Sequence, residues 1–352
     1  MAHPRETFSQ DELTAVLSYY DLGTVQSAVD FPRGSHASPK MIVTTDRAKY
    51  LVKRRPSGKT DAFRVAFSHD LQNYLADKNF PLPHLIGTTA DNNSMLKLDD
   101  SIYEVFEFVE GGHYDGSVPA TEDAGKTLAL YHKLVYEFHP HYEPPRGQYH
   151  DSQSVREALP RIGGILLSTP TGQGKRDELT QLIVRIREVY NAAAAAVNAL
   201  GIGTWESQIV HADWHPGNML FERRMVVAVL DYDAARIRQR VTDIANGCLQ
   251  FSMVTAGRDL STWEARTDVE RANRFLRGYD ELNVITQAEL QALPFLMQEA
   301  LIAQAVPPIL KTGTFAGLEG IGFLNVMLNK AAWLQAHGGE IGLDLPERTA
   351  SQ

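Results

Sequence analysis

The sequence predicts an α+β fold with a small β-rich N-terminal lobe, residues 1–110, followed by a larger helical C-terminal lobe, residues 111–352. Two changes in hydrophobic periodicity support this division. Short apolar runs of strand length dominate the first hundred or so residues, whereas runs with helical spacing dominate the chain after Gly111 and Gly112. One hairpin-like stretch, residues 209–233, interrupts the helical part. A chain of 352 residues can bury a large apolar core without a stabilising metal or disulfide.

The small lobe is expected to open with a helix, because Ser9 and Glu12 have the spacing of a capping box. A strand-like run follows near Val25. The runs 41–43 and 50–52 flank a polar turn, and together they predict an antiparallel hairpin.

A helix is expected next from about Thr60 to Lys78, with Phe63 on its apolar face. Two more strands are predicted, near residues 85–88 and from Met95 through Val109, because a polar turn separates these apolar runs.

Helical periodicity predicts the rest of the second lobe. Three helices are expected before the hairpin-like stretch: residues 120–135, 154–167 and 177–200. Helices return after Asp243, where Thr286 and Glu289 form a second capping box. Pro307-Pro308 is expected to break or kink the helix that carries residues 296–306, because proline lacks the backbone N–H.

Charge and cysteine content exclude several classes of protein. A net charge of −9 with no Lys/Arg-rich stripe argues against nucleic acid as the main partner. Cys248 is the only cysteine, so no intrachain disulfide forms, which fits a reducing compartment. The opening residues do not form a secretory signal, and the weakly polar run 191–200 is too short to span a membrane. We therefore expect a cytoplasmic protein with no membrane partner; the oligomeric state stays open.

The stretch 209–233 carries the chemistry. Its apolar runs flank the polar Glu222-Arg223-Arg224 turn, so the hairpin folds Asn218 back beside Asp231. Asp213 precedes Asn218 by five residues. Carboxylate and amide oxygens suit Mg²⁺, which keeps several waters and binds substrate phosphates.

His211-x-Asp213-x₄-Asn218 matches the spacing of the kinase catalytic loop, and Asp231 follows where a metal-binding aspartate is expected. The segments HADWHPGN and LDYDAA and the later Asp243 resemble the aminoglycoside phosphotransferase and choline kinase-like superfamily. Homoserine kinases of the second type and spore-coat kinase-like proteins belong to it as well. The resemblance covers most of the chain and implies a two-lobed, protein-kinase-like fold that uses ATP and Mg²⁺.

The resemblance also implies roles for single residues. Asp213 would accept or orient the proton of the attacking hydroxyl, and Asn218 and Asp231 would hold magnesium. Asp233 is a weaker supporting candidate, and Asp243 would brace the catalytic loop. His211 is expected to hold that loop in shape by hydrogen bonding.

Residues of the small lobe would bind the nucleotide. Lys53 would reach the phosphates as a point charge, and the loop 31–38, with Ser35 and His36, would cover them with backbone amides. Glu107 and Val109 would present backbone groups to adenine.

Two features depart from the kinase pattern. The phosphate loop contains only Gly34, and no glutamate occurs between Lys53 and Ile102 to pair with Lys53. Asp70, in the predicted helix, is the nearest substitute, so the identity of the carboxylate partner stays open.

The acceptor is expected to be a small molecule with a hydroxyl group. Glu299 and the negative charge balance favour a cationic acceptor: an amino alcohol, a hydroxy amino acid or an amino sugar. Trp214 is a weaker substrate candidate whose default role is core or cleft wall. A protein serine also stays possible as the acceptor.

Other interpretations use the same residues. His211, Asp213, His215 and Asp231 or Asp233 have the chemistry to ligate two metals for hydrolysis, although this hypothesis does not explain the small lobe. A catalytically silent scaffold of kinase-like form is a third interpretation. The bland alternative is a turn-rich loop whose Asp and Asn side chains cap their own backbone.

Overall fold

The computed structural model describes residues 5–32, 34, 36–56, 58–255 and 257–346. Its chain forms two compact units. The first comprises Met1–His113, Glu137–Pro145 and Asn218–Ala235, and the second comprises Tyr114–Tyr136, Arg146–Gly217 and Arg236–Gln352. The first unit therefore contains the predicted nucleotide-binding residues together with Asn218 and Asp231, whereas Asp213 belongs to the second unit.

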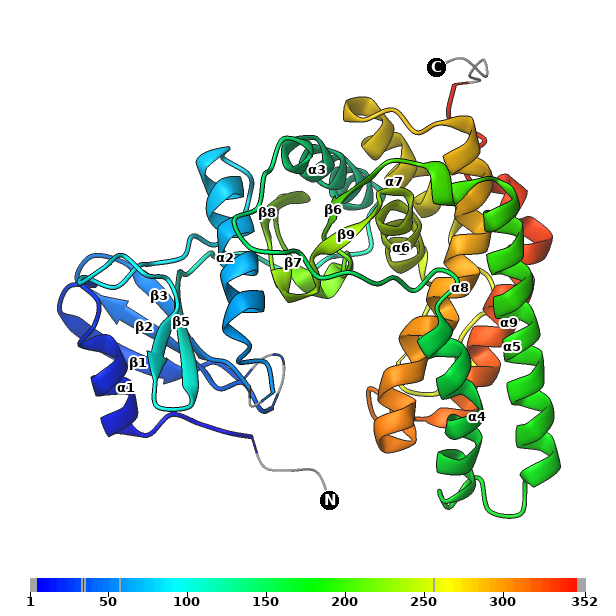
Figure 1. Ribbon diagram of the computed structural model, residues 1–352, viewed down its shortest axis with the longest axis horizontal. Helices are drawn as coiled ribbons and strands as arrows, with labels where there is room; N and C mark the ends of the chain where they lie inside the picture. The colour runs from blue at the N-terminus through cyan, green and yellow to red at the C-terminus, as the bar shows by residue number, and fades with distance from the viewer. Residues whose placement is uncertain (1–4, 33, 35, 57, 256, 347–352) are drawn as a thin grey trace. The chain divides into compact units, whose positions relative to one another are not determined.

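An antiparallel sheet with the strand order β1-β2-β3-β5-β4 forms the centre of the first unit (Figure 1). The helix α1 and the predicted hairpin β2–β3 are confirmed, and the Ser9–Glu12 capping box is present. The elements of this part are α1 (Gln10–Leu17), β1 (Val25–Asp30), β2 (Lys40–Thr45), β3 (Lys49–Arg54), α2 (Ala62–Asp77), β4 (Leu96–Leu98) and β5 (Ser101–Glu107).

Strand β3 divides its side chains between two environments, because successive residues of a strand point to opposite faces. Val52 is buried in the cluster that α1 covers, and Arg54 forms an ion pair with Glu12 of α1 on that same face. Lys53 and Arg55 therefore point to the other face, where the polar network described below lies.

Three expectations for this unit are corrected. The predicted strand 95–109 is two strands, β4 and β5, because the chain turns at Asp99, which has a φ of 50°. Leu85 forms only an isolated bridge to Phe106. Phe63, placed on the buried face of α2, is 77% exposed because it lies in the first turn of the helix.

The predicted hairpin after Asn218 is confirmed as β7 (Met219–Glu222) and β8 (Met225–Val229). Arg223 and Arg224 both have positive φ values, 48° and 69°, the backbone that a two-residue turn requires to match the strand twist.

Helices make up most of the second unit, which also contains two pairs of short strands, β6 with β9 and β10 with β11. The predicted helical blocks are confirmed, with ends shifted by one or two residues, and the Thr286–Glu289 capping box is present. The elements are α3 (Val118–Tyr136), α4 (Gln153–Leu167), α5 (Arg176–Ala199), β6 (Ser207–Val210), β9 (Arg236–Gln239), α6 (Val241–Ser252), α7 (Val269–Leu282), α8 (Gln287–Thr312), β10 (Thr314–Phe315), β11 (Leu318–Glu319) and α9 (Gly320–His337). The predicted α+β fold is confirmed.

Helix α8 differs from the expectation in one respect. It continues through Pro307 and Pro308 to Thr312 without a break. Its buried flank, including Val306 and Ile309, holds the helix together where the prolines supply no N–H. By length and apolar composition alone, this helix would be enough to cross a membrane. Because 67% of its apolar window is buried inside the protein, a core helix is the simpler account.

Candidate active site

Lys53 on β3 and Glu104 on β5 are direct cross-strand partners in the antiparallel sheet. Lys53 Nζ lies 3.0 Å from Glu104 Oε2, and the Glu104 side chain is only 1% exposed. Burial has the largest single effect and lowers the pKa of Lys53, but the charges of Glu104, Asp233 and Asp231 together outweigh it, so the net pKa is raised. Lys53 therefore stays protonated and is held in one position.

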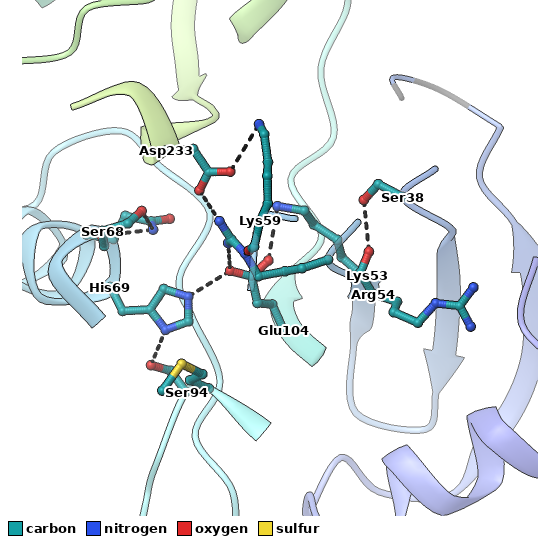
Figure 2. A network of polar contacts seen from close by, with 12 residues as sticks. Ser38, Lys53, Arg54, Lys59, Ser68, His69, Ser94, Glu104 and Asp233 are labelled. Carbon is teal, nitrogen blue, oxygen red and sulfur yellow. Dashed lines mark hydrogen bonds and ion pairs between the residues drawn. The ribbon is translucent and has the colours of Figure 1, made fainter. Parts of the chain in front are cut away.

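Glu104 is the centre of a buried polar network on this face of the sheet (Figure 2). Arg55 Nη1 donates to Glu104 Oε1, and His69 Nε2 of α2 lies 2.8 Å from the same oxygen. The other ring nitrogen of His69 lies 2.8 Å from the Ser94 hydroxyl. Burial raises the pKa of Glu104, but Lys53, His69 and Arg55 together hold it well below its usual range.

Arg55 links this network to the segment after the hairpin. One end of its guanidinium contacts Glu104, and the other, Nη2, donates to Asp233 Oδ1. Lys59 Nζ lies 3.5 Å from the second oxygen of Asp233. Asp233 is therefore occupied by two cations, an arrangement that favours a structural role over metal ligation.

The predicted substitute partner of Lys53, Asp70, is wrong. Asp70 accepts hydrogen bonds from the backbone N–H of His141, at 2.8 Å, and from His141 Nδ1, at 2.9 Å. The expected carboxylate, Asp70, lies on helix α2, whereas Glu104 lies on strand β5 of the sheet. The available signal was the alternation of β5, which places Glu104 opposite Lys53 once the register is known.

Asn218 and Asp231 meet at the open end of the β7–β8 hairpin. The backbone N–H of Leu230 donates to the carbonyl of Asn218 at 2.8 Å, which brings Asp231 next to Asn218. Asp231 is exposed and has a φ of 62°, so its side chain leaves the strand direction. One carboxylate and one amide oxygen are a donor set that suits Mg²⁺, which keeps waters and uses substrate oxygens for its other positions.

A second lysine, which was not among the expected site residues, lies next to the loop 31–38. Lys40, at the start of β2, is the register partner of Lys53. A Cβ at Gly34 would lie 2.8 Å from Lys40 Nζ, so this amino group lies close under the loop. Burial, followed by the Lys53 charge, lowers the pKa of Lys40. Two cations, Lys40 and Lys53, therefore lie side by side on the neighbouring strands β2 and β3.

The structure gives fewer contacts for the other residues that were predicted to bind the nucleotide. Ser35 lies outside the described residues. His36 is exposed, and its carbonyl accepts the backbone N–H of Glu6 at 3.0 Å. The N–H of Glu107, the last residue of β5, donates to the His84 carbonyl at 2.9 Å, so this donor is already used. Val109 follows β5 by two residues.

In the second unit, Asp243 of α6 organises the backbone of the loop that carries Asp213. Asp243 Oδ2 accepts the N–H of His211 at 2.8 Å, and Oδ1 accepts the N–H of Ala212 at 2.9 Å. Ala212 has a φ of 64°, a strained conformation for a residue with a Cβ. The two bonds to a fully buried carboxylate hold the loop in this conformation.

A histidine completes the surroundings of Asp243. His132 Nε2 of α3 lies 3.3 Å from Asp243 Oδ2, and His132 Nδ1 lies 2.8 Å from the Tyr279 hydroxyl. Burial lowers the pKa of His132, and this effect exceeds the opposing one of Asp243. We infer a neutral ring that donates from Nε2 and accepts from Tyr279. Burial raises the pKa of Asp243, but the interactions with His132 and with His211, including its backbone N–H, together outweigh burial, so the net pKa is lowered.

Asp213 itself is 44% exposed at its side chain. His215 Nε2 lies 3.6 Å from Asp213 Oδ2, while His215 Nδ1 accepts the backbone N–H of Gly217 at 3.0 Å. Since Nδ1 is an acceptor, the proton of a neutral His215 is on Nε2, facing Asp213. The loop thus presents an accessible carboxylate beside an N–H donor.

Two predicted substrate contacts are corrected. Trp214 is completely buried, with its ring edge-on to His211 at 5.4 Å, so it belongs to the core under the loop. Glu299 is also completely buried, because its oxygens accept from His150 Nδ1 at 2.7 Å and from the Asp151 N–H at 2.8 Å. Neither side chain presents a surface to a ligand.

The binuclear metal cluster of the hydrolase hypothesis is not assembled. Within the described ranges, no three His, Cys, Asp or Glu side chains gather as a metal-ligand group. His211, which that hypothesis needs as a ligand, is buried.

Comparisons with known proteins identify the family and the fold of this chain. A family described as the phosphotransferase enzyme family matches residues 29–307. The chain belongs to this family. Homoserine kinase of Gluconobacter oxydans (strain 621H) is 26% identical over 302 residues, which cover 83% of this chain and 84% of that protein. The predicted resemblance is therefore confirmed.

Two solved structures share the fold at low sequence identity. A microcompartment-associated aminopropanol kinase gives a TM-score of 0.66 at 14% identity and covers 95% of this chain and 99% of that chain. The amicoumacin kinase hAmiN, in complex with AMP-PNP, Ca²⁺ and Ami, gives 0.65 at 12% identity, with 94% of each chain covered. The phosphotransferase thus has the kinase-like α+β fold that its sequence predicts.

Proposed function

We propose that this phosphotransferase transfers the γ-phosphate of ATP to a hydroxyl group of a small molecule. The observation that carries the proposal is the Lys53–Glu104 pair at 3.0 Å, in the same compact unit as Asn218 and Asp231. A fixed cation and a magnesium-type donor set are the two features that phosphoryl transfer requires of a protein at the phosphates.

Each residue has a defined part in this proposal. Lys53 binds the phosphates as a point charge, and Glu104 keeps its side chain in place. Asn218 and Asp231 hold Mg²⁺, which supplies charge neutralisation at the phosphate oxygens. Asp213 accepts the proton of the acceptor hydroxyl or aligns it, and His215 Nε2–H stabilises the Asp213 carboxylate. Catalysis rests on positioning and charge, because the protein forms no covalent bond to the phosphoryl group.

The acceptor that we propose is a small amino alcohol, a hydroxy amino acid or an amino sugar. Support comes from the similar proteins: the relative is named a homoserine kinase, and one structural neighbour is named an aminopropanol kinase. Both names describe a molecule with a hydroxyl and an amine. ATP dependence and the buried Cys248 fit a reducing cytoplasmic setting.

An ADP-release assay tests the proposal. The full chain is given Mg-ATP and a panel of hydroxylated amines, amino acids, sugars and aminoglycosides, and Asp213→Asn is run in parallel. Release that depends on one acceptor class and is lost in Asp213→Asn, with nucleotide binding retained, is the expected result. Equal rates in both proteins would contradict the role of Asp213. Hydrolysis activated by Zn²⁺ or Mn²⁺ without ATP would favour the hydrolase interpretation, and no ATP binding by calorimetry would favour a silent scaffold.

A further inference from the structure

A cavity of about 500 Å³ lies in the second compact unit, next to the loop that carries Asp213. Pro216, three residues after Asp213, forms part of its wall. The rest of the wall comes from the loop before α3, the end of α6 with the residues that follow it, and the start of α7. A volume of this size suits a small polar metabolite.

A chain of side-chain amides connects the catalytic loop to the cavity wall. Asn246 Nδ2 donates to the Trp214 carbonyl at 3.3 Å, and Gln304 Nε2 donates to Asn246 Oδ1. Gln250 Nε2, on the wall, donates to Gln304 Oε1 at 2.6 Å. These bonds fix the wall relative to the backbone next to Asp213.

Arg271 of α7 supplies a positive charge to the wall. Its Nε donates to Asp268 Oδ2 at 2.9 Å and its Nη2 to the Met253 carbonyl at 3.2 Å, so the guanidinium is held in one orientation. Its side chain remains 16% exposed. The Nη1 atom lies about 4.0 Å from the position of a Cβ at Gly116, so its N–H groups lie next to the cavity wall at Gly116. A guanidinium has five N–H donors; these two contacts use two of them, and Arg271 also forms a hydrogen bond with Tyr114.

Asp115 supplies a negative charge to the same wall. It is exposed, and its Oδ1 accepts the Ser117 N–H at 2.9 Å, which orients the carboxylate. Thr255 and Tyr114 also line the cavity, and the Tyr114 hydroxyl forms a hydrogen bond with the Thr121 hydroxyl. The cavity thus combines one anion and one fixed cation, the complement of a molecule that carries both an ammonium and a carboxylate group.

We propose that this cavity binds the acceptor and selects a hydroxylated α-amino acid, with Arg271 contacting its carboxylate and Asp115 its ammonium group. The proposal rests on the proposed function, since it names the substrate class of that activity. It replaces Glu299, the carboxylate expected from the sequence, with Asp115. It also assigns to Arg271 the discrimination between an amino acid and the amino alcohol that lacks the carboxylate.

Three candidate acceptors test the Arg271 contact and the Asp115 contact separately, because two of them each lack one charged group of the third. L-homoserine carries both charges, 3-aminopropan-1-ol lacks the carboxylate, and 4-hydroxybutanoate lacks the ammonium. We expect Arg271→Gln to raise KM for L-homoserine about tenfold or more, with kcat little changed, because a charge-assisted bond to the ground state and transition state alike is lost. KM for 3-aminopropan-1-ol should change less than about twofold. Asp115→Asn should raise KM for the two amines, L-homoserine and 3-aminopropan-1-ol, and leave KM for 4-hydroxybutanoate unchanged.

Arg277→Gln is the matched control on α7, since Arg277 pairs at 3.9 Å with Glu122 and does not line the cavity. It should leave all three KM values unchanged. Arg271→Lys keeps the charge without the fork, and it provides a second variant if Arg271→Gln proves unstable. Equal changes of KM for L-homoserine and 3-aminopropan-1-ol in Arg271→Gln, or in the Arg271→Lys variant, would overturn the proposal.

Calorimetry with L-homoserine separates this proposal from the proposed function. Binding of L-homoserine that is lost in Arg271→Gln but retained in Arg277→Gln supports the cavity assignment. If such binding occurs without any release of ADP, only the proposed kinase activity is contradicted. Wild-type protein that phosphorylates 3-aminopropan-1-ol but does not bind L-homoserine would overturn the cavity assignment and leave the kinase activity standing. Absence of both binding and transfer would overturn both.

Discussion

Lys53 and Glu104 face each other across β3 and β5, with Lys53 Nζ 3.0 Å from Glu104 Oε2, and the carboxylate is fixed from behind by Arg55 and His69. The carboxylate that orients Lys53, for which we propose phosphate binding, therefore comes from the sheet. Helix α2 contributes a histidine, His69, which holds that carboxylate. Lys53 is thus positioned by a direct partner in its own sheet, with the helix acting through His69 on that partner.

Glu104→Gln should raise KM for ATP about tenfold or more and lower the free energy of unfolding by about 3 kcal/mol, because it leaves buried cations without their counter-charge. Steady-state kinetics and urea unfolding measure the two effects. Asp70→Asn is the matched control, since Asp70 bonds only His141 among the contacts recorded for it. A loss of ATP affinity in Asp70→Asn but not in Glu104→Gln would reverse the assignment.

Arg55→Lys should weaken the affinities for ATP and magnesium together, by about three- to tenfold, because a lysine cannot bond Glu104 and Asp233 at once. Titrations of activity with ATP and with Mg²⁺ give both constants. Arg54→Lys is the control from the opposite face of β3, where Arg54 pairs with Glu6 and Glu12. Equal shifts in both variants would mean that charge on the strand, and not the bridge, is what counts.

Asp231→Ala should raise the Mg²⁺ concentration at half-maximal activity about tenfold or more. In metal sites, even the loss of a group that hydrogen-bonds to a ligand lowers metal affinity by about tenfold or more, and Asp231 is proposed as a ligand itself. Asn218→Ala should act in the same direction. The control is Asp100→Ala, an exposed turn residue of the same unit. An unchanged magnesium titration in Asp231→Ala would count against its role as a ligand.

The free energy of unfolding should depend on pH through the buried Lys330. This buried side chain of α9 donates to the carbonyls of Val254, Glu264 and Arg266, and burial lowers its pKa to about 8. The unfolded chain binds the proton up to about pH 10.4, so between these values the unfolded state holds more protons and stability rises with pH.

Urea unfolding at pH 7 and at pH 9.5 checks this effect against Lys330→Met. Wild type should gain about 1–2 kcal/mol over the variant across this interval, at about 1.4 kcal/mol per pH unit above 8. Parallel pH profiles for the two proteins would show that Lys330 does not titrate in this range.

Local chemistry made much of the site predictable. The capping box at Ser9, the β7–β8 turn and the spacing from Asp213 to Asn218 depend on neighbours within a few residues, so the sequence indicates them directly. The same holds for Asn218 and Asp231, which one hairpin joins. These local patterns also carried the family resemblance.

Partners that are distant in the chain were decided by the tertiary structure. Glu104 follows Lys53 by 51 positions, and only the register of β3 against β5 places them opposite each other. Burial likewise removed Trp214 and Glu299 from the candidate substrate contacts. Local sequence determines which conformation a segment adopts, because turns and caps are short-range interactions. Which buried charges meet depends on strand pairing and packing between segments, and these exist only once the chain has folded.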